Sequence, residues 1–244
     1  MIASPQEIWV YLAASPLLNL TMTLAAYLVG DYLFRKSGHM AIFNPVLIAI
    51  VILVSILLAT GTSYQTYFEG AQFVHFLLGP ATVALAIPLY RQFDRVRHSG
   101  PAILISLLVG SATAVVSATV ITWLLGAPQV VVASIAPKSA TTPIAMGISE
   151  QIGGLPSLTA VLVILTGITG AVVGTSLLGR LGVREASAQG FALGLASHGI
   201  GTARALQVSE LAGAFSALAM GLNGLATSLL APLLLNLLGR WFWP

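Results

Sequence analysis

The segment Val131–Met146 places residues that a membrane-spanning helix rarely carries inside an apolar stretch long enough to cross a lipid bilayer. It contains two prolines, Pro137 and Pro143, with Lys138 and three hydroxyl side chains between them. In a bilayer, a free cation and broken backbone hydrogen bonds are tolerated only where they line a cavity or meet a partner. The segment is therefore predicted to be a broken helix that forms part of a ligand site. A second interrupted stretch, Ala196–Ala205, follows in the next apolar unit.

The composition identifies the class of protein. Hydrophobic residues make up 57% of the chain and charged residues only 7%, with a mean hydropathy of +0.95, which excludes an ordinary soluble domain. The expected environment is a lipid bilayer crossed several times. No window combines basic and aromatic residues as a nucleic-acid surface does, so no nucleic-acid partner is expected. The chain has no cysteine, which excludes disulfides, thiol chemistry and cysteine-based metal sites.

The apolar residues fall into eight segments, which we expect to be the helices of an all-α polytopic membrane protein. The segments are Leu17–Phe34, Pro45–Thr60, Phe73–Tyr90, Pro101–Leu125, Val130–Ile148, Leu155–Leu178, Ala188–Leu206 and Gly213–Leu238. They form pairs over roughly 17–60, 73–125, 130–178 and 188–238. Pro45, Pro101 and Pro156 open the second member of successive pairs at separations of 56 and 55 residues. This period predicts one helix–loop–helix unit used four times in a single domain of residues 1–244.

Basic residues concentrate in three loops and predict the orientation in the membrane. They are Arg35 and Lys36 in the first loop, Arg91, Arg95 and Arg97 in the second, and Arg180 and Arg184 in the third. The third loop falls on the wrong side if all eight segments cross. We therefore expect Val130–Ile148 to be re-entrant, which leaves seven crossings with the N-terminus outside and Arg240 on the cytoplasmic side. The alternative is that this segment crosses and the third loop lies outside.

The chemistry expected at the two interrupted stretches follows from helix ends. Pro137 removes a backbone donor, and Thr142 before Pro143 is typical of a helix start with the threonine hydroxyl as N-cap. In the second stretch two glycines loosen the backbone, and Thr202 is expected to cap a half-helix that begins at Ala203. Two helix N-termini facing one cavity, with cationic side chains beside them, predict a site for an anion. The candidate binding residues are the two cations, five hydroxyl residues and one imidazole: Lys138, Arg204, Ser139, Thr141, Thr142, Ser197, Thr202 and His198.

Each of these residues also has a plainer structural interpretation. Lys138 and Arg204 can extend to the membrane surface or pair with Glu150 and Glu210. A lone histidine is more often a hydrogen-bonded core residue, and serine and threonine commonly bond their own helix. Three further polar residues are expected to serve either ion coupling or structure, namely Glu150, Gln151 and Asn223.

Several blocks of the sequence resemble the signature blocks of the LrgB/CidB family of bacterial membrane proteins. They are Leu77–Tyr90, Ala136–Ala145, Ile148–Ala160, His198–Ala205 and Gly213–Asn223. The resemblance extends over nearly the whole chain from about Leu17. It departs at Ser139–Thr141, where Ser-Val-Thr is usual, and at Ser197–Gly199, where a small residue often replaces glycine; neither change removes a polar group.

This resemblance implies a multi-pass protein of the bacterial cytoplasmic (inner) membrane. It implies a partner of the small LrgA/CidA-like, holin-like type and a link to murein hydrolase export and autolysis. It also implies similarity to the C-terminal half of the plant plastid glycolate/glycerate translocator. A self-associating homo-oligomer stays open, and so does the choice between proton and sodium coupling; no other cofactor is expected.

Three classes of function remain after these observations. The anion site favours a secondary transporter of small organic carboxylates such as glycolate, glycerate, lactate or pyruvate. A holin-like pore component, or a regulator of murein hydrolase export and autolysis, needs no convergent helix ends around cations. An intramembrane enzyme is disfavoured, because no carboxylate in the sequence is placed to orient His198 as a base for Ser139 or Ser197.

Overall fold

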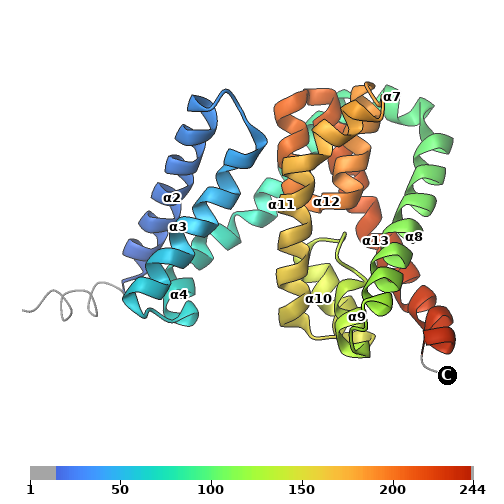
Figure 1. Cartoon of the computed structure of the whole chain (residues 1–244). Helices are drawn as coiled ribbons and strands as arrows, with labels where there is room; N and C mark the ends of the chain where they lie inside the picture. The colour runs from blue at the N-terminus through green and yellow to red at the C-terminus, as the bar shows by residue number, and fades with distance from the viewer. Residues whose placement is uncertain (1–14, 243–244) are drawn as a thin grey trace, which may run out of the picture. The chain divides into compact units, whose positions relative to one another are not determined.

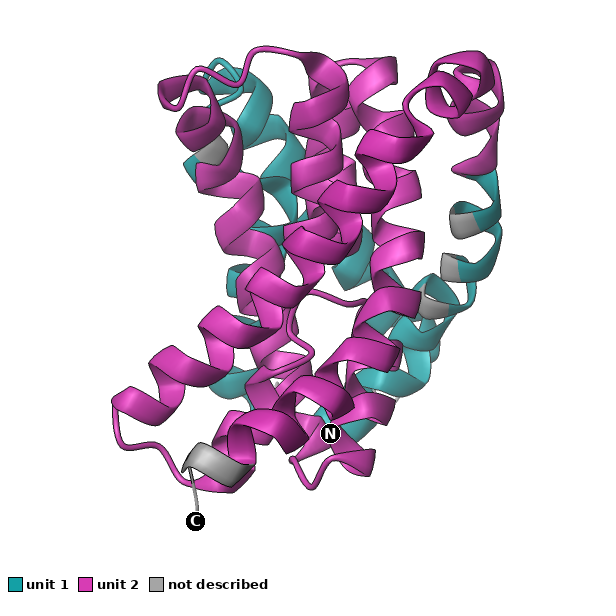
Figure 2. Cartoon of the chain, turned by 90° about the vertical axis from the view of Figure 1, so that its right-hand side faces the viewer, with its two compact units in different colours: residues 1–84 teal, residues 85–244 magenta. Residues whose placement is uncertain are grey.

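The computed structural model describes residues 15–242, and the regular structure within them is entirely helical, as expected. The helices are α2 (Pro16–Lys36), η1 (Ala41–Phe43), α3 (Pro45–Thr60), α4 (Tyr64–Phe76), α5 (Leu78–Ala84), α6 (Ala86–Arg91), α7 (Phe93–His98), α8 (Gly100–Leu124), α9 (Gln129–Ile135), α10 (Thr142–Gln151), α11 (Pro156–Arg180), α12 (Ala186–Val208) and α13 (Glu210–Phe242). The chain divides into two compact units, unit 1 (residues 1–84) and unit 2 (residues 85–244), coloured separately in Figure 2. The expectation of a single domain and of four paired repeats stays a prediction.

Four helices within residues 15–242 are long and apolar enough to cross a membrane. They are α2, α8, α11 and α13; the bent pair Tyr64–Val74 and Gly79–Arg91 is a fifth candidate, and α3 is a shorter apolar helix. Large apolar side chains are exposed along these helices, for example Leu104 and Leu108 on α8 and Leu165 on α11. Such surfaces are typical of helices that face lipid, and the chain is accordingly a polytopic membrane protein.

Proline opens the helices where the sequence analysis placed it. Pro45, Pro101 and Pro156 occupy the first turns of α3, α8 and α11, where the missing N–H leaves no helical bond unmade. At α3 the Asn44 side chain caps the helix, since its Oδ1 accepts from the N–H groups of Val46 (2.9 Å) and Leu47 (3.2 Å).

Unit 1 is a small helical unit in which α2 packs against both α3 and α4. Glycine allows both close approaches: a Cβ added at Gly30 would lie 2.6 Å from the carbonyl oxygen of Pro45, and Gly70 approaches Pro16 equally closely. Thr23 and Tyr67 join α2 to α4 through a hydrogen bond between their hydroxyl groups (2.8 Å).

In unit 2, α9, residues 136–141 and α10 form a hairpin, which we call the first hairpin (Figure 1). Trp123 at the end of α8 and Ile152 after α10 both pack against the cluster that contains Val132 and Ala133 of α9. The N–H of Leu155, just before α11, donates to Oγ of Ser134 in α9 (2.8 Å). The chain therefore enters and leaves the first hairpin at the same end of unit 2, and α8 and α11 run in opposite directions.

α12 is a second hairpin, because the chain turns back at Ser197 and His198. Gly201, after this turn, lies against the backbone of Leu193, before it. Residues eight apart in a straight helix would be separated by about 12 Å. Ala186 at the start of α12 and Ala205 near its end pack in one cluster, so both ends of the second hairpin lie together.

The two hairpins enter unit 2 from opposite ends. Val96 of α7, Ile103 of α8 and Leu211 of α13 pack on one cluster, and Leu178 of α11 packs with Ala212 of α13. We call this the basic end, because it carries both basic loops of unit 2, and the second hairpin enters here. The first hairpin enters at the opposite end, away from α7 in Figure 1.

α13 runs from the basic end to the opposite end. Glu210 at its start pairs with Arg91 (3.3 Å), and Leu235 packs against α9. The last part of α13 thus lies at the end of unit 2 opposite both of its basic loops, and the cytoplasmic side expected for Arg240 stays a prediction. That expectation counted α12 as a crossing, whereas α12 turns back within unit 2.

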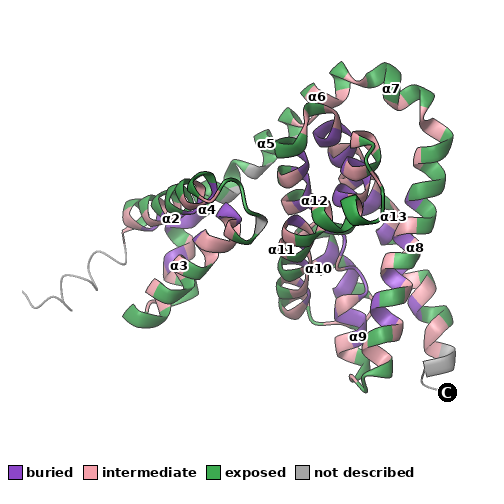
Figure 3. Ribbon diagram, turned by 45° about the horizontal axis from the view of Figure 1, so that its top comes forward, coloured by how far each residue is buried: buried purple, intermediate pink, exposed green. Residues whose placement is uncertain are grey.

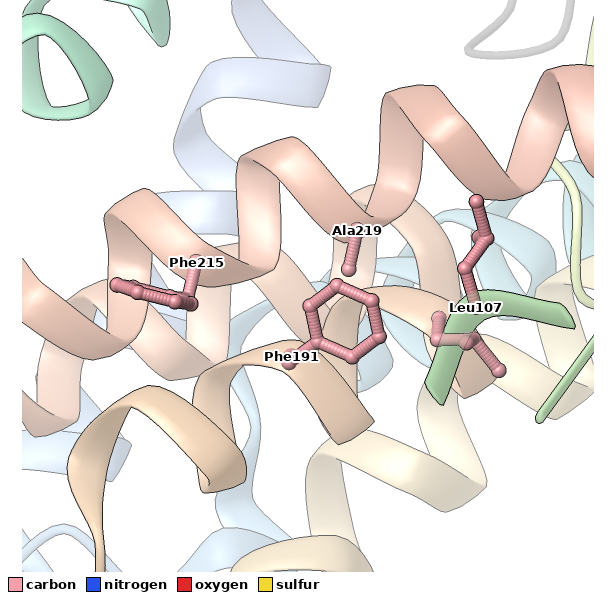
Figure 4. Close-up of a cluster of buried hydrophobic side chains, with 5 residues drawn as sticks. Leu107, Phe191, Phe215 and Ala219 are labelled. Carbon is pink, nitrogen blue, oxygen red and sulfur yellow. The ribbon is translucent and has the colours of Figure 1, made fainter. Parts of the chain in front are cut away.

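The core of unit 2 lies between α8, α12 and α13. Figure 4 shows Phe191 of α12 beside Leu107 of α8, with Phe215 and Ala219 of α13. Gly190 and Gly194 allow α12 to approach the backbone of α13, a packing role that their spacing predicts. In Figure 3 buried residues gather on α9, α12 and α13, whereas α7 and the first half of α8 are mostly exposed.

Candidate functional site

The break predicted between Pro137 and Pro143 is confirmed. α9 ends at Ile135, and residues 136–141 form turns before α10 begins at Thr142. The N-cap position belongs to Thr141, whose backbone is extended, rather than to Thr142. The Thr141 side chain makes no capping hydrogen bond within residues 15–242, so the expected Thr142 cap is wrong, although Pro143 lies in the first turn as predicted.

The second break lies earlier than predicted, at Ser197 (φ −133°, ψ 17°) and His198 (φ 42°, ψ −134°). Thr202 does not cap a half-helix from Ala203, because its hydroxyl donates to the His198 carbonyl (2.9 Å) within the helix that follows the break. A non-glycine residue with positive φ is strained by about 1–3 kcal/mol, and such strain persists only where surrounding contacts enforce it.

Helix α11 supplies those contacts. A Cβ added at Gly167 would lie 2.7 Å from Cε1 of His198, and Gly170 lies against Oγ of Ser197. Nε2 of His198 donates to the Val163 carbonyl (2.9 Å). Gly167 and Gly170, one turn apart on α11, therefore leave room for His198 and Ser197.

Asn223 of α13 joins the two breaks. Its Nδ2 donates to the carbonyl of Ser139 in the first hairpin (3.0 Å) and to that of Leu195 in the second (3.1 Å). Its Oδ1 accepts from the hydroxyls of Ser111 (2.6 Å) and Thr227 (3.2 Å). All hydrogen-bonding positions of this buried amide are used, and Asn223 holds the hairpin tips together in the middle of unit 2.

Lys138 lies at the first break and lines a cavity of about 360 Å³. The other lining residues come from α11 and from the second break: Leu162, Leu165, Thr166, Thr169, Gly170, Ala196 and Ser197. The ion pairs among residues 15–242 are Asp31–Arg35 and Arg91–Glu210, so Lys138 is not paired with a carboxylate there. Ser139 beside it is buried, and its Oγ has no hydrogen-bond partner in the described part of the chain. A cation, hydroxyl groups and an open cavity are thus brought together at the hairpin tips.

The structure does not bring all predicted site residues to this cavity. Arg204 lies on the returning half of α12, near the basic end, and donates to Oε1 of Gln207 (3.0 Å). Glu150 and Gln151 are exposed at the end of α10. Thr202 is buried and accepts from the Ser216 hydroxyl (3.0 Å). The remaining predicted hydroxyl residues, Thr141 and Thr142, are half-buried at the start of α10 and do not line the Lys138 cavity.

Residues that the sequence analysis did not single out complete the arrangement. Thr166 and Thr169 line the cavity from α11, and Ser111 bonds Asn223 from α8. The available signal was the run Thr166-Gly-Ile-Thr-Gly170, in which small and hydroxyl residues recur at helical spacing.

A comparison with known proteins identifies the family. The sequence profile of the LrgB-like family matches residues 23–237. The chain belongs to the LrgB-like family.

Relatives match the chain over nearly its full length. They include the uncharacterized protein YwbG of Bacillus subtilis (strain 168), 35% identical over 220 residues, or 90% of this chain and 97% of that protein. The uncharacterized protein YxaC of the same strain is 37% identical over 222 residues (91% and 96%). The antiholin-like protein LrgB of Bacillus mycoides (strain KBAB4) is 32% identical over 225 residues (92% and 98%). None of these three names is that of an enzyme, and no solved structure gives a significant match.

Proposed function

We propose that this LrgB-like chain is a secondary transporter of small organic carboxylates across the cytoplasmic membrane. The observation that carries the proposal is Lys138, which has no carboxylate partner among the described residues and lines a cavity where two broken helices meet. Discontinuous helices near mid-membrane are the usual binding sites of secondary transporters.

The charge argument favours an anion as ligand. An unpaired ammonium group away from water is costly, and a bound carboxylate supplies the counter-charge that residues 15–242 do not provide. Thr166, Thr169 and Ser197 line the same cavity and offer hydroxyl donors to the second carboxylate oxygen or to a hydroxyl or keto group. A small hydroxy or keto acid such as glycolate, glycerate, lactate or pyruvate matches this set of groups.

The proposal includes a membrane topology with two re-entrant hairpins. Each hairpin enters and leaves unit 2 at one end, so neither crosses. The eight apolar segments then comprise six crossings, in α2, α3, the α4–α6 region, α8, α11 and α13, and two re-entrant elements. This arrangement puts the loops with Arg35, Arg97 and Arg184 on one side of the membrane, as the positive-inside rule requires.

Reconstitution tests the proposal. The purified chain alone in liposomes is expected to take up labelled glycolate, lactate or pyruvate, and an imposed proton or sodium gradient will identify the coupling ion. Lys138→Met is expected to reduce uptake at least about tenfold, because loss of the counter-charge costs more than about 1.4 kcal/mol.

A matched lysine provides the control. Lys36 is exposed at the end of α2, beside the Tyr32 ring, and Lys36→Met should leave uptake unchanged. Wild-type uptake by Lys138→Met, in a protein that is correctly inserted, would reject the anion site.

A second candidate function rests on the relatives. Bacillus proteins of this family are named antiholin-like, which supports a holin-like pore component or a regulator of murein hydrolase export and autolysis more directly than carboxylate transport. In this case the chain acts with an LrgA/CidA-like membrane protein, or as a homo-oligomer. Absence of uptake by the chain alone, together with altered autolysis on its deletion and co-purification of such a partner, would favour this candidate.

A further inference from the structure

A second cavity, of about 450 Å³, lies between α8 and the first half of α12. It extends from Ser99 and Ser187, at the starts of the two helices, to Gly110 and Ala196 near the middle of unit 2. Ala196 also lines the Lys138 cavity, so the tip of the second hairpin separates the two cavities. Gly110 and Leu195 meet at the inner end of the second cavity, where a Cβ on Gly110 would lie 2.9 Å from Cδ1 of Leu195.

The outer end of this cavity lies at the basic end of unit 2. Arg95 and Arg97 of α7 immediately precede α8, and Arg184 precedes α12. All three residues are exposed. A mouth flanked by arginines raises the local concentration of small anions.

The corresponding position at the opposite end of unit 2 is closed. There the Thr159 hydroxyl on α11 lies within hydrogen-bond distance of the Ser134 carbonyl (2.9 Å) and of Oγ of Ser149 (2.7 Å). Ser134, Ser149 and Thr159 are all fully buried. Gly154 packs directly on this cluster, since a Cβ there would lie 2.8 Å from the backbone nitrogen of Ser134. We call these three residues the hydroxyl cluster.

The open and closed positions are equivalent in the plan of unit 2. A long helix followed by a hairpin occurs twice, as α8 with the first hairpin and α11 with the second, in opposite directions. With the breaks aligned, Ala136, Thr142 and Ala145 correspond to Ala196, Thr202 and Ala205, each 60 residues later. The α8–α12 cavity then corresponds to the α11–α9 contact that holds the hydroxyl cluster. Inverted repeats of this kind permit alternating access, in which two equivalent interfaces exchange between open and closed.

We infer that the α8–α12 cavity is the vestibule through which an anion reaches Lys138 from the basic side, and that the hydroxyl cluster is the closed gate of the other side. This inference rests on the proposed transport function. In the alternate state the first half of α12 closes against α8, and α9 separates from α11. Ser106 and Ala192 line the vestibule, and Ala196 lies at its inner end.

The absence of native cysteine allows a direct test, because single-cysteine variants need no prior substitutions. Ser106→Cys and Ala192→Cys are each treated with an anionic thiol reagent that cannot cross membranes. The reagent is added to one side of oriented vesicles. Both are expected to react at least about tenfold faster from the basic side, which Glu185→Cys identifies, and faster with an anionic than with a cationic reagent. Ser134→Cys is expected to be unreactive from either side until substrate is supplied.

Ser117→Cys is the matched control. Ser117 is exposed on the same face of α8, eleven residues or about three turns beyond Ser106, and does not line the vestibule. It should stay unreactive because lipid excludes the reagent.

The outcomes separate the vestibule from the transport function. Two results would overturn the vestibule even if uptake depends on Lys138. In the first, Ser106→Cys and Ala192→Cys are as unreactive as Ser117→Cys. In the second, they react from the side opposite Glu185→Cys. Side-specific labelling in a protein without uptake would support a water-filled vestibule and reject the transport proposal alone.

Discussion

At the scale of single residues, His198 shows that position and backbone decide the effect of a side chain. Its φ of 42° and ψ of −134° suit glycine, which adopts positive φ without strain. We predict that His198→Gly is more stable than His198→Ala by about 1 kcal/mol, because both lose the bond to Val163 but only glycine relieves the strain. The measurement is the melting temperature in detergent. In an ordinary helix, alanine is more stable than glycine by about 1 kcal/mol. Ala203→Gly, at an exposed position in the same half-helix, should therefore lower the melting temperature. A His198→Ala protein that melts above His198→Gly would contradict the strain.

Asn223 contributes through hydrogen bonds that reach three other elements. Asn223→Ala removes four bonds, and polar bonds within membrane proteins average about 0.6 kcal/mol each, so we expect a loss of about 2 kcal/mol in unfolding free energy. Ser228, also on α13, is exposed, and its hydroxyl donates to the Leu225 carbonyl of its own helix. Ser228→Ala should therefore change stability by less than 0.5 kcal/mol, about the level of an ordinary surface substitution. Equal effects of the two substitutions would show that Asn223 does not join the hairpins.

The residues of the candidate site were partly predictable from the sequence. Pro137 and Pro143 fix the first break, because each removes a backbone donor wherever it stands. The second break was misplaced, since Gly199 and Gly201 permit a turn without requiring one there. Gly167 and Gly170, which make room for the turn at Ser197, lie about thirty residues earlier in the chain. Long-range contacts of this kind leave no local signature, which is also why Arg204 was expected beside Lys138.

At the scale of helices, α11 acts as the support for the break in α12. Gly170→Ala would place a Cβ on the Ser197 hydroxyl, so we expect a loss of about 1–3 kcal/mol as the break shifts, with reduced uptake. Gly179 lies on the same helix with open space around it, and Gly179→Ala should be neutral or stabilising by up to about 1 kcal/mol. Chemical or thermal unfolding in detergent measures both variants. Indistinguishable unfolding of the two variants would show that α12 adapts without help from α11.

The helices themselves follow from the apolar segments, whereas the direction of the chain does not. The eight expected segments correspond to α2, α3, the α4–α6 region, α8, α9 with α10, α11, α12 and α13. Apolar length predicts a helix, but a helix that turns back on itself has the same composition as one that continues. In α12 the turn depends on the contact between Gly201 and Leu193 and on packing against α13. The path of the chain within a segment was therefore less predictable than the position of the segment.

At the scale of the whole molecule, the proposed topology with two re-entrant hairpins decides on which side of the membrane the chain ends lie. Under the proposed topology, six crossings bring both termini to one side of the membrane, opposite the loops that contain Lys36, Arg97 and Arg184. We predict that a reporter or single cysteine placed after residue 242 is accessible from the side opposite Glu185→Cys. A reporter before residue 15 should share the side of the C-terminal one. The physical reason is that α13 starts at the basic end, where Glu210 meets Arg91, and runs to the other end with α9.

The same labelling distinguishes the two topologies that the basic loops permit. If α12 crossed, the C-terminus and Glu185→Cys would react from the same side, and Arg240 would add to the cytoplasmic positive charge. Two hairpins instead leave Arg240 as a single basic residue at the external end of α13, a weak signal beside the two basic loops of unit 2. The loops on the other side carry seven basic residues, namely Arg35, Lys36, Arg91, Arg95, Arg97, Arg180 and Arg184. A C-terminus found on the side of Glu185 would therefore remove the second re-entrant hairpin, and with it the equivalence of the two halves of unit 2 on which the vestibule depends.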